Sequence, residues 1–145
     1  INHALKVYAL ASGIGKSEGL EGEGIFILEA AAVLHDIGIK ESERKYNSSA
    51  GRYQEIEGPP VARGILDEFK IGEDALERIC FLIGNHHTYG KVEGMDYRAL
   101  IEADFLVNIY EDELDEQKIR TIGEKHFKTA AGKKYLYSMY EASRA

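Results

Sequence analysis

The chain has 145 residues, of which 44% are hydrophobic and 30% charged, and its net charge is −7. This is enough chain to bury a sizeable core, and we predict one domain over residues 1–145. The acidic balance and the lack of a basic stripe argue against a nucleic-acid polymer as partner. A single cysteine, Cys80, excludes an internal disulfide and fits a cytoplasmic location. No apolar run has the length of a membrane span, so we expect no membrane partner.

Two helices are predicted in the first quarter of the chain. Residues 2–12 are rich in Ala, Leu and Val, which favour a helix, and because the chain begins at Ile1 we leave open that this helix is cut short. Residues 13–24 are glycine-rich and acidic and are predicted to be a loop. Residues 25–36 are apolar on nearly every side, which predicts a central, almost fully buried helix. Gly38 stands where a glycine would cap the end of that helix.

The rest of the chain is predicted to be helical after one long polar loop. Residues 40–56 lack a sustained apolar period and are predicted to be a loop, of a kind that is often functional. Gly58 with the two prolines after it is predicted to begin the next helix, because proline suits a first turn. Later helices are expected from Glu73, over Asp96–Tyr110, over Glu116–Phe127 and over Ala130–Ala142. With no convincing strand, the predicted fold class is all-α, with about six or seven helices.

Polar residues stand at two places where the helical pattern predicts burial. His35 and Asp36 end the apolar run, and Asp104 lies on the inner stripe of its helix with Leu100 and Val107. Burying such groups is costly unless they are paired or bind a metal. One imidazole and one carboxylate held together make half of a divalent metal site. For Asp104, the spacing leaves an interior salt bridge open as the alternative.

The remaining histidines carry less information by themselves. His3 is a single histidine on an amphipathic helix, where a core or boundary residue is the common case. The apolar stripe through Ile83 continues to His86 and His87, and neighbours on a helix point about 100° apart. We therefore expect at most one of the two to face the same centre as Asp104.

Taken in order, His3, His35-Asp36 and Asp104 resemble the HD-domain metal-dependent phosphohydrolase superfamily, in particular its small uncharacterised prokaryotic members. The resemblance covers nearly the whole chain and rests on four segments, namely residues 30–38, 57–66, 83–87 and 102–108. It implies an all-helical fold with one buried metal, whose ligands would be His3, His35, Asp36 and Asp104. Such a mixture of nitrogen and oxygen donors suits Mn, Fe, Co, Ni or Zn better than Mg.

The resemblance also implies a metal-dependent hydrolase of phosphate esters, with nucleotides among the candidate substrates, acting through metal-activated water. Asp36 would bind the metal and orient or deprotonate the water. His86 is expected to point into the metal pocket, where it would bind a phosphoryl oxygen or protonate the leaving group. His87 is also a candidate for binding the substrate, with a less definite role than His86.

Three basic residues follow the His35-Asp36 pair closely. Lys40 is a candidate catalytic residue, and Arg44 and Lys45 are candidates for binding the substrate phosphate. A charged loop that only faces solvent is the alternative for all three.

One departure from the family pattern bears on the number of metals. Members with two metals usually carry a histidine shortly before the position of Gly58, and here Gln54 stands there, with Glu55 and Glu57 close by. We therefore predict one metal, with a weak second one completed by Glu55 or Glu57 as the alternative. The alternative function is a non-catalytic HD module that binds a nucleotide or metal and regulates a partner. Homodimerisation is left open by the sequence.

Overall fold

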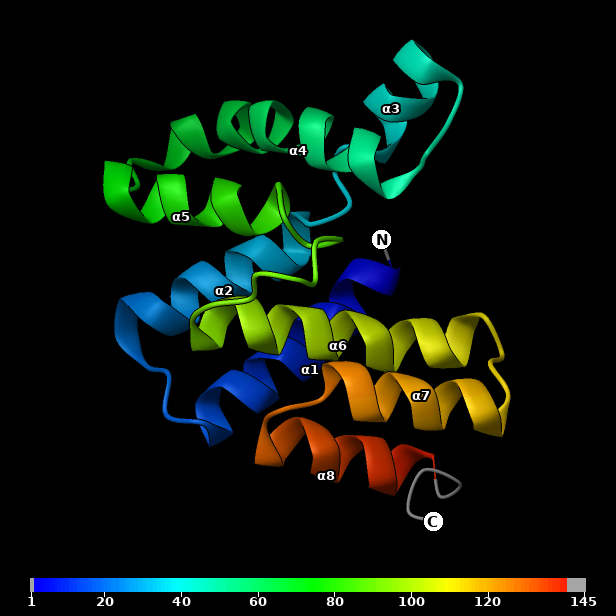
Figure 1. Ribbon diagram of the computed structural model, residues 1–145. Coiled ribbons are helices and arrows are strands. Elements are labelled where there is room, and N and C mark those ends of the chain that lie inside the picture. Colours follow the sequence, from blue (N-terminus) through cyan, green and yellow to red (C-terminus); the bar gives the residue numbers. More distant parts are fainter. Residues whose placement is uncertain (1, 141–145) are drawn as a thin grey trace.

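Residues 2–140 are the part of the chain that the computed structural model describes, and they form eight α-helices, one short 3-10 helix and no strand (Figure 1). The elements are α1 (Asn2–Ser17), α2 (Gly22–Leu34), α3 (Ile39–Tyr46), α4 (Gly51–Leu66), η1 (Asp67–Phe69), α5 (Glu73–Ile83), α6 (Met95–Glu111), α7 (Glu116–His126) and α8 (Ala130–Met139). The all-α prediction is confirmed, with more helices than expected. The predicted end of the last helix, at Ala142, lies outside the described residues. Within residues 2–140, no helix combines the length and the apolar character needed to cross a membrane.

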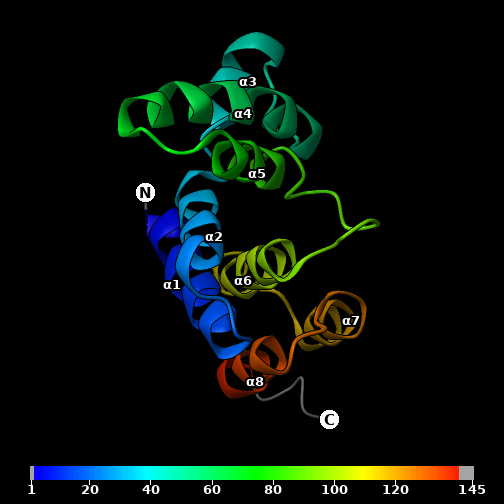
Figure 2. The same cartoon turned by 90° about the vertical axis from the view of Figure 1, so that its left-hand side faces the viewer.

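Helix α2 lies in the middle of the arrangement, as the sequence predicted. It packs against α1, α5 and α6, while α3 and α4 lie beyond α5 and α7 and α8 lie on the other side of α6 (Figures 1 and 2). Leu28, Ala31 and Ala32 are fully buried in the core. The expectation of almost complete burial is wrong, because Phe26 and Val33 are 44% and 42% exposed. The neighbouring helices cover only part of the circumference of α2, so its last apolar face stays open.

The predicted loop over residues 13–24 is mostly helical, because α1 continues to Ser17 and α2 begins at Gly22. Gly13 and Gly15 lie inside the helix, where a Cβ on Gly13 would be 3.3 Å from a ring carbon of Tyr135, and one on Gly15 would be 2.6 Å from a methyl group of Leu28. The two glycines allow neighbouring helices to approach α1 closely. Tertiary packing therefore overrides the low helix propensity on which the loop prediction rested.

The predicted loop over residues 40–56 is also wrong, because it contains α3 and the first turns of α4. Helix α3 has only Ser42 buried, so it lacks the apolar stripe that signals a helix. Helix α4 begins at Gly51 and passes through Pro59 and Pro60, which the sequence placed at its start. Each proline removes one backbone N–H donor from the helix, at a cost that packing between α3 and α5 must offset.

Gly38 serves a close approach between backbones and not the helix cap that we predicted. Its φ of −81° is right-handed, so no left-handed cap forms there. A Cβ on Gly38 would lie 2.6 Å from the amide nitrogen of Gly58 and 2.8 Å from the carbonyl oxygen of Gln54. Glycine at this position therefore lets α4 lie directly against the turn that carries His35 and Asp36.

A buried carboxylate fixes the start of α8. Glu102 on α6 accepts hydrogen bonds from the backbone N–H groups of Lys128 (2.8 Å) and Thr129 (3.1 Å) and from the Thr129 hydroxyl (2.6 Å). Burial raises the pKa of the Glu102 carboxyl, and the three donors oppose that rise. A Cβ on Gly132 would overlap an oxygen of this carboxylate. The Glu102 carboxylate can therefore bind the start of α8 only because Gly132 has no side chain.

This contact predicts that Gly132→Ala destabilises the fold by about 1–3 kcal/mol, the usual cost of overpacking a well-filled interior. Alanine is normally the better helix residue by about 1 kcal/mol, so steric conflict must outweigh propensity. Gly64→Ala is the matched control, because its Cβ would have no atom within 4 Å, and it should stabilise the protein slightly. Urea unfolding of both variants measures the difference. A Gly132→Ala protein as stable as the wild type would contradict the packing argument.

Candidate metal centre

Three separate parts of the fold bring two imidazoles and two carboxylates to one place. His3 lies in the first turn of α1, and Asp104 lies in the middle of α6. His35 and Asp36 lie in the turn directly after α2, and not inside the helix as predicted. Donor atoms of His3, His35 and Asp104 all lie within 4.8 Å of one another. The four residues that the sequence proposed as ligands are therefore neighbours in space.

The distances within this group are those of hydrogen bonds and ion pairs. His3 Nε2 lies 3.0 Å from Asp104 Oδ1 and 3.3 Å from Asp36 Oδ2. His35 Nε2 lies 3.3 Å from each of the same two carboxylates. The side chain of His35 is fully buried and that of Asp104 nearly so, whereas 28% of the Asp36 side chain remains exposed. The group is thus open where Asp36 and His3 lie, because the His3 side chain is also 22% exposed.

A second group of possible donors shares Asp36 and includes both histidines of the turn after α5. Asp36, His86 and His87 each offer an atom, all within 4.8 Å of one another. His86 Nε2 lies 3.5 Å from Asp36 Oδ1, and His87 Nε2 lies 3.1 Å from Gln54 Oε1. The expectation that at most one of the two histidines faces the same centre as Asp104 assumed a helix. Because α5 ends at Ile83, the helical angle between neighbours does not apply, and each of the two offers a nitrogen within 4.8 Å of an Asp36 oxygen.

The backbone fixes the orientation of two of these imidazoles. His35 Nδ1 donates a hydrogen bond to the carbonyl oxygen of Ala32, and His86 Nδ1 donates one to that of Ile83, both at 2.7 Å. A carbonyl oxygen can only accept, so each Nδ1 carries the hydrogen and each Nε2 is the atom presented to the group. His86 Nε2 is buried and has no hydrogen-bond partner among the described residues. An orphaned buried nitrogen of this kind is typical of a ligand position.

The turn that carries His86 and His87 is held from α4 and α6. Glu55 Oε2 accepts hydrogen bonds from the backbone N–H of His87 (3.0 Å) and the hydroxyl of Thr88 (2.8 Å). The Tyr97 hydroxyl donates to the carbonyl oxygens of Asn85 and Thr88. Glu55 is therefore engaged in shaping the turn, and it does not belong to either group of possible donors.

Two of the three basic residues after Asp36, Arg44 and Lys45, lie in ion pairs of their own. Lys45 Nζ is 2.8 Å from Glu57 Oε1. The carboxylate of Glu57, the other candidate ligand for a second metal, is therefore engaged in an ion pair. Arg44 is 2.8 Å from Glu41. Lys40 and Lys45 line a pocket of about 460 Å³ between α3 and α4, and none of the imidazoles or aspartates of the two groups lines it. Their assignment to the phosphate of a substrate stays a prediction.

Charge in the centre is distributed as imidazolium and carboxylate. Burial lowers the pKa of His35, but its hydrogen bonds to Asp104 and Asp36 outweigh burial and raise that pKa to about 10. Burial acts to raise the pKa of Asp104, yet His3 and His35 hold it well below its usual range. The pKa of Asp36 is likewise lowered, with His35 and His86 outweighing burial. Burial lowers the pKa of His87, which therefore stays neutral near pH 7.

These observations fit a divalent transition metal. Imidazole Nε2 atoms and carboxylate oxygens converge from different elements, and such mixed sets of donors bind Mn, Fe, Co, Ni or Zn. A metal would replace the proton that His35 holds between two carboxylates, since metal ligands must be deprotonated. It would also give the orphaned His86 Nε2 a partner within reach of Asp36.

Glu111 contacts the centre and was not predicted from the sequence. Glu111 Oε1 accepts a hydrogen bond of 2.7 Å from His3 Nδ1. A signal for it was present, because Glu111 follows Asp104 by seven residues, and this spacing returns to the same face of a helix.

An all-helical protein with buried histidines and aspartates grouped as metal donors is the class that this fold and this centre define. The chain belongs to the HD-domain family, whose family model matches residues 1–120 and thus includes both donor groups. Members of this superfamily are generally metal-dependent phosphohydrolases. No curated protein and no solved structure gives a significant match to the chain.

Proposed function

We propose that this protein is a metal-dependent hydrolase of phosphate esters, with nucleotides as the leading class of substrate. The observation that carries the proposal is the position of Asp36 between two groups of possible metal ligands. His3, His35 and Asp104 form one group, and His86 and His87 belong to the other. Membership of the HD-domain family supports the reaction class. The particular substrate is a proposal that rests on this family likeness alone.

His3, His35, Asp36 and Asp104 would hold one divalent transition metal in this function. Such an ion, when bound, lowers the pKa of a water molecule and polarises a phosphoryl oxygen. The four side chains contribute two carboxylate charges, which would offset the charge of a divalent ion and leave the centre close to neutral. An anionic phosphate would therefore not be repelled at the open side of the centre, where Asp36 lies.

Asp36 is assigned to hold and orient the attacking water. Its carboxylate is the most exposed among His3, His35, Asp36 and Asp104, so it is the group that incoming solvent and substrate reach first. As a metal ligand Asp36 must be ionised, and the charge of the bound ion would lower its basicity, which suits an acceptor of a hydrogen bond better than a strong base. This favours the orienting role over the deprotonating role among the two that the sequence left open.

His86 is assigned to the substrate side of the centre. In its neutral form Nδ1 carries the hydrogen and Nε2 offers a lone pair; in its protonated form Nε2 donates toward the open side near Asp36. The protonated form would bind a phosphoryl oxygen or protonate the leaving group. The alternative is a second metal held by Asp36, His86 and His87, which the neutral form would suit.

His86→Ala separates these two roles. If His86 acts on the substrate, the variant should keep one equivalent of metal and lose about 10²–10⁴-fold in turnover, the usual contribution of an acid–base group. Metal content measured by elemental analysis, together with phosphate release, tests both points. His126→Ala is the matched control, since His126 belongs to neither donor group. Two equivalents in the wild type that fall to one in His86→Ala would favour the second metal, and unchanged turnover would remove His86 from the site.

The experiment that tests the proposed function is a panel of phosphomonoesters and phosphodiesters, nucleotides included, assayed on metal-stripped protein with Mn, Fe, Co, Ni, Zn and Mg added singly. Phosphate or alcohol release that depends on the metal is the expected result. Binding of metal or nucleotide without turnover of any ester would favour the alternative, a non-catalytic HD module that regulates a partner.

A further inference from the structure

Glu111, the last residue of α6, contacts His3 on the side of the imidazole that faces away from the candidate metal centre. Glu111 Oε1 accepts a 2.7 Å hydrogen bond from His3 Nδ1, while His3 Nε2 faces Asp104 and Asp36. The imidazole thus lies between a carboxylate on each side. This is the arrangement in which a second carboxylate orients a histidine that binds a metal.

The other histidines of the centre are oriented in a different way. His35 and His86 each donate Nδ1–H to the carbonyl oxygen three residues earlier in their own segment. His3 is instead oriented by a side chain from a distant helix, 108 residues away in sequence. Its side chain is 22% exposed, so it is the least enclosed of the three. Glu111 is therefore the side chain that orients His3, whereas the backbone orients His35 and His86.

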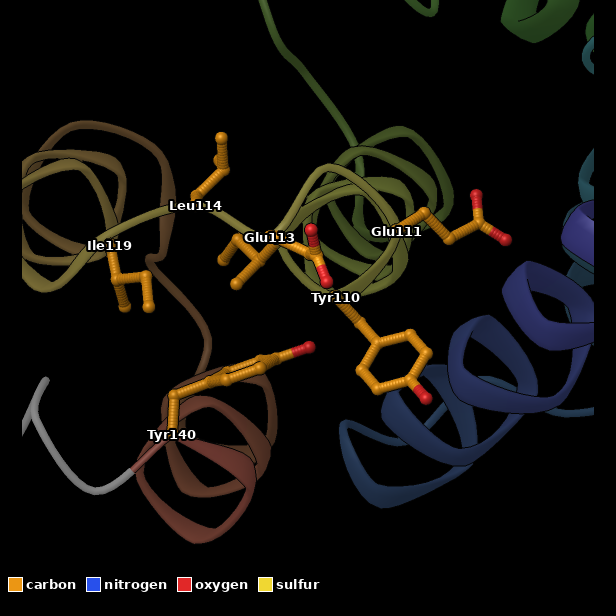
Figure 3. A pocket seen from close by; sticks show the side chains of 7 residues that line it. Tyr110, Glu111, Glu113, Leu114, Ile119 and Tyr140 are labelled. Atoms are coloured by element: carbon orange, nitrogen blue, oxygen red, sulfur yellow. The ribbon is translucent and has the colours of Figure 1, made fainter.

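The Glu111 carboxylate is directed toward α1, at the edge of a hollow that Glu111 also lines. Figure 3 shows the carboxylate directed toward α1, whereas Tyr140, Ile119 and Leu114 gather at the other side of the cavity of about 430 Å³. Its second oxygen lies 3.5 Å from Lys6 Nζ, also on α1. Both carboxylate oxygens of Glu111 therefore contact residues in the first two turns of α1.

We propose that Glu111 is a positioning residue for the metal. Its carboxylate fixes the tautomer of His3, holds the plane of the ring and makes Nε2 a more basic ligand. This inference rests on the proposed function, because it presumes that the centre binds a metal. The competing explanation is a purely structural contact, in which Glu111 joins the end of α6 to the start of α1 through His3 and Lys6.

Glu111→Gln tests the proposal, because the amide keeps the size of the side chain and removes its charge. Zn²⁺ affinity should fall by about 10–100-fold in a chelator competition at fixed pH, the usual effect of losing such a partner. Two controls are matched to it: Lys6→Met removes the other partner of Glu111, and Glu113→Gln alters a nearby carboxylate of the same cavity. Both controls should bind Zn²⁺ as the wild type does. Nitrogen-15 NMR of the histidine rings in the zinc-loaded protein should show Nδ1–H on His3 in the wild type.

Three outcomes are distinguishable. If the wild type binds none of the metals, the proposed function fails. If the wild type binds Zn²⁺ and Glu111→Gln binds it equally well, the inference on Glu111 is overturned while the metal centre stands. If Glu111→Gln and Lys6→Met lower the Zn²⁺ affinity and the melting temperature of the metal-free protein to the same extent, the contact is structural and the positioning role is also overturned.

Discussion

Asp36→Ala should reduce metal-dependent phosphoesterase turnover by about 10³-fold or more, because in the proposed function Asp36 is both a metal ligand and the acceptor that orients the attacking water. His35→Ala should do the same, since its Nε2 lies 3.3 Å from each of the two aspartates of the centre. The measurement is steady-state phosphate release with the metal that gives the highest wild-type activity. Circular dichroism of each variant shows whether the fold is retained.

Asp67→Ala is the control for this prediction. Asp67 is an exposed residue of η1, at the end of α4, and it belongs to neither donor group. It should keep full activity. An Asp36→Ala protein that retains nearly full metal-dependent turnover would refute the assignment of the centre, and an equal loss in Asp67→Ala would show that the assay reports folding.

Asp104→Ala should empty the metal centre and also destabilise the metal-free protein by about 3–5 kcal/mol, the usual cost of removing one partner of a buried ion pair. Asp104 is nearly buried and accepts from His3 at 3.0 Å, and it is one of the two carboxylates that raise the pKa of His35 to about 10. Without it, the buried imidazole of His35 must either stay charged with one partner fewer or lose its proton. Either course costs stability in the folded state.

Urea unfolding of the chelator-treated protein measures this loss, and elemental analysis measures the metal. Asp112→Ala is the matched control, because Asp112 is exposed and follows α6 directly. It should change the free energy of unfolding by less than about 0.5 kcal/mol. An Asp104→Ala protein that keeps its metal, or that is as stable as the wild type without metal, would contradict the role given to this residue.

The polar residues of the centre were predictable because burial of a charge is costly and therefore rare. His35 and Asp36 interrupt the longest apolar run, and Asp104 interrupts the inner stripe of α6, so each stands out against its neighbours. His3 became a candidate only through the ordered family pattern, because one histidine on an amphipathic helix has no such contrast. Hydrophobic periodicity likewise predicted the existence of α5 and α6.

Other features depend on contacts between segments that are far apart in sequence. Helix α3 has almost no apolar stripe and α4 contains two internal prolines, so local propensity opposed both, and packing against the neighbouring helices decided them. The end of α5 at Ile83 brings a nitrogen of both His86 and His87 within 4.8 Å of an Asp36 oxygen, which the helical pattern did not predict. The local sequence pattern thus predicts which buried polar side chains need a partner, and contacts between distant segments supply that partner.

By itself, the sequence determined the all-helical class, the central place of α2 and the identity of His35, Asp36 and Asp104 as residues that need a partner. Each of these follows from the energy of burying apolar or charged groups, which composition and spacing reveal. Only the tertiary structure decided which partners they have. The hydrogen bond from His3 to Glu111 joins two residues 108 positions apart, and such a contact depends on the relative placement of two helices, which no local spacing specifies.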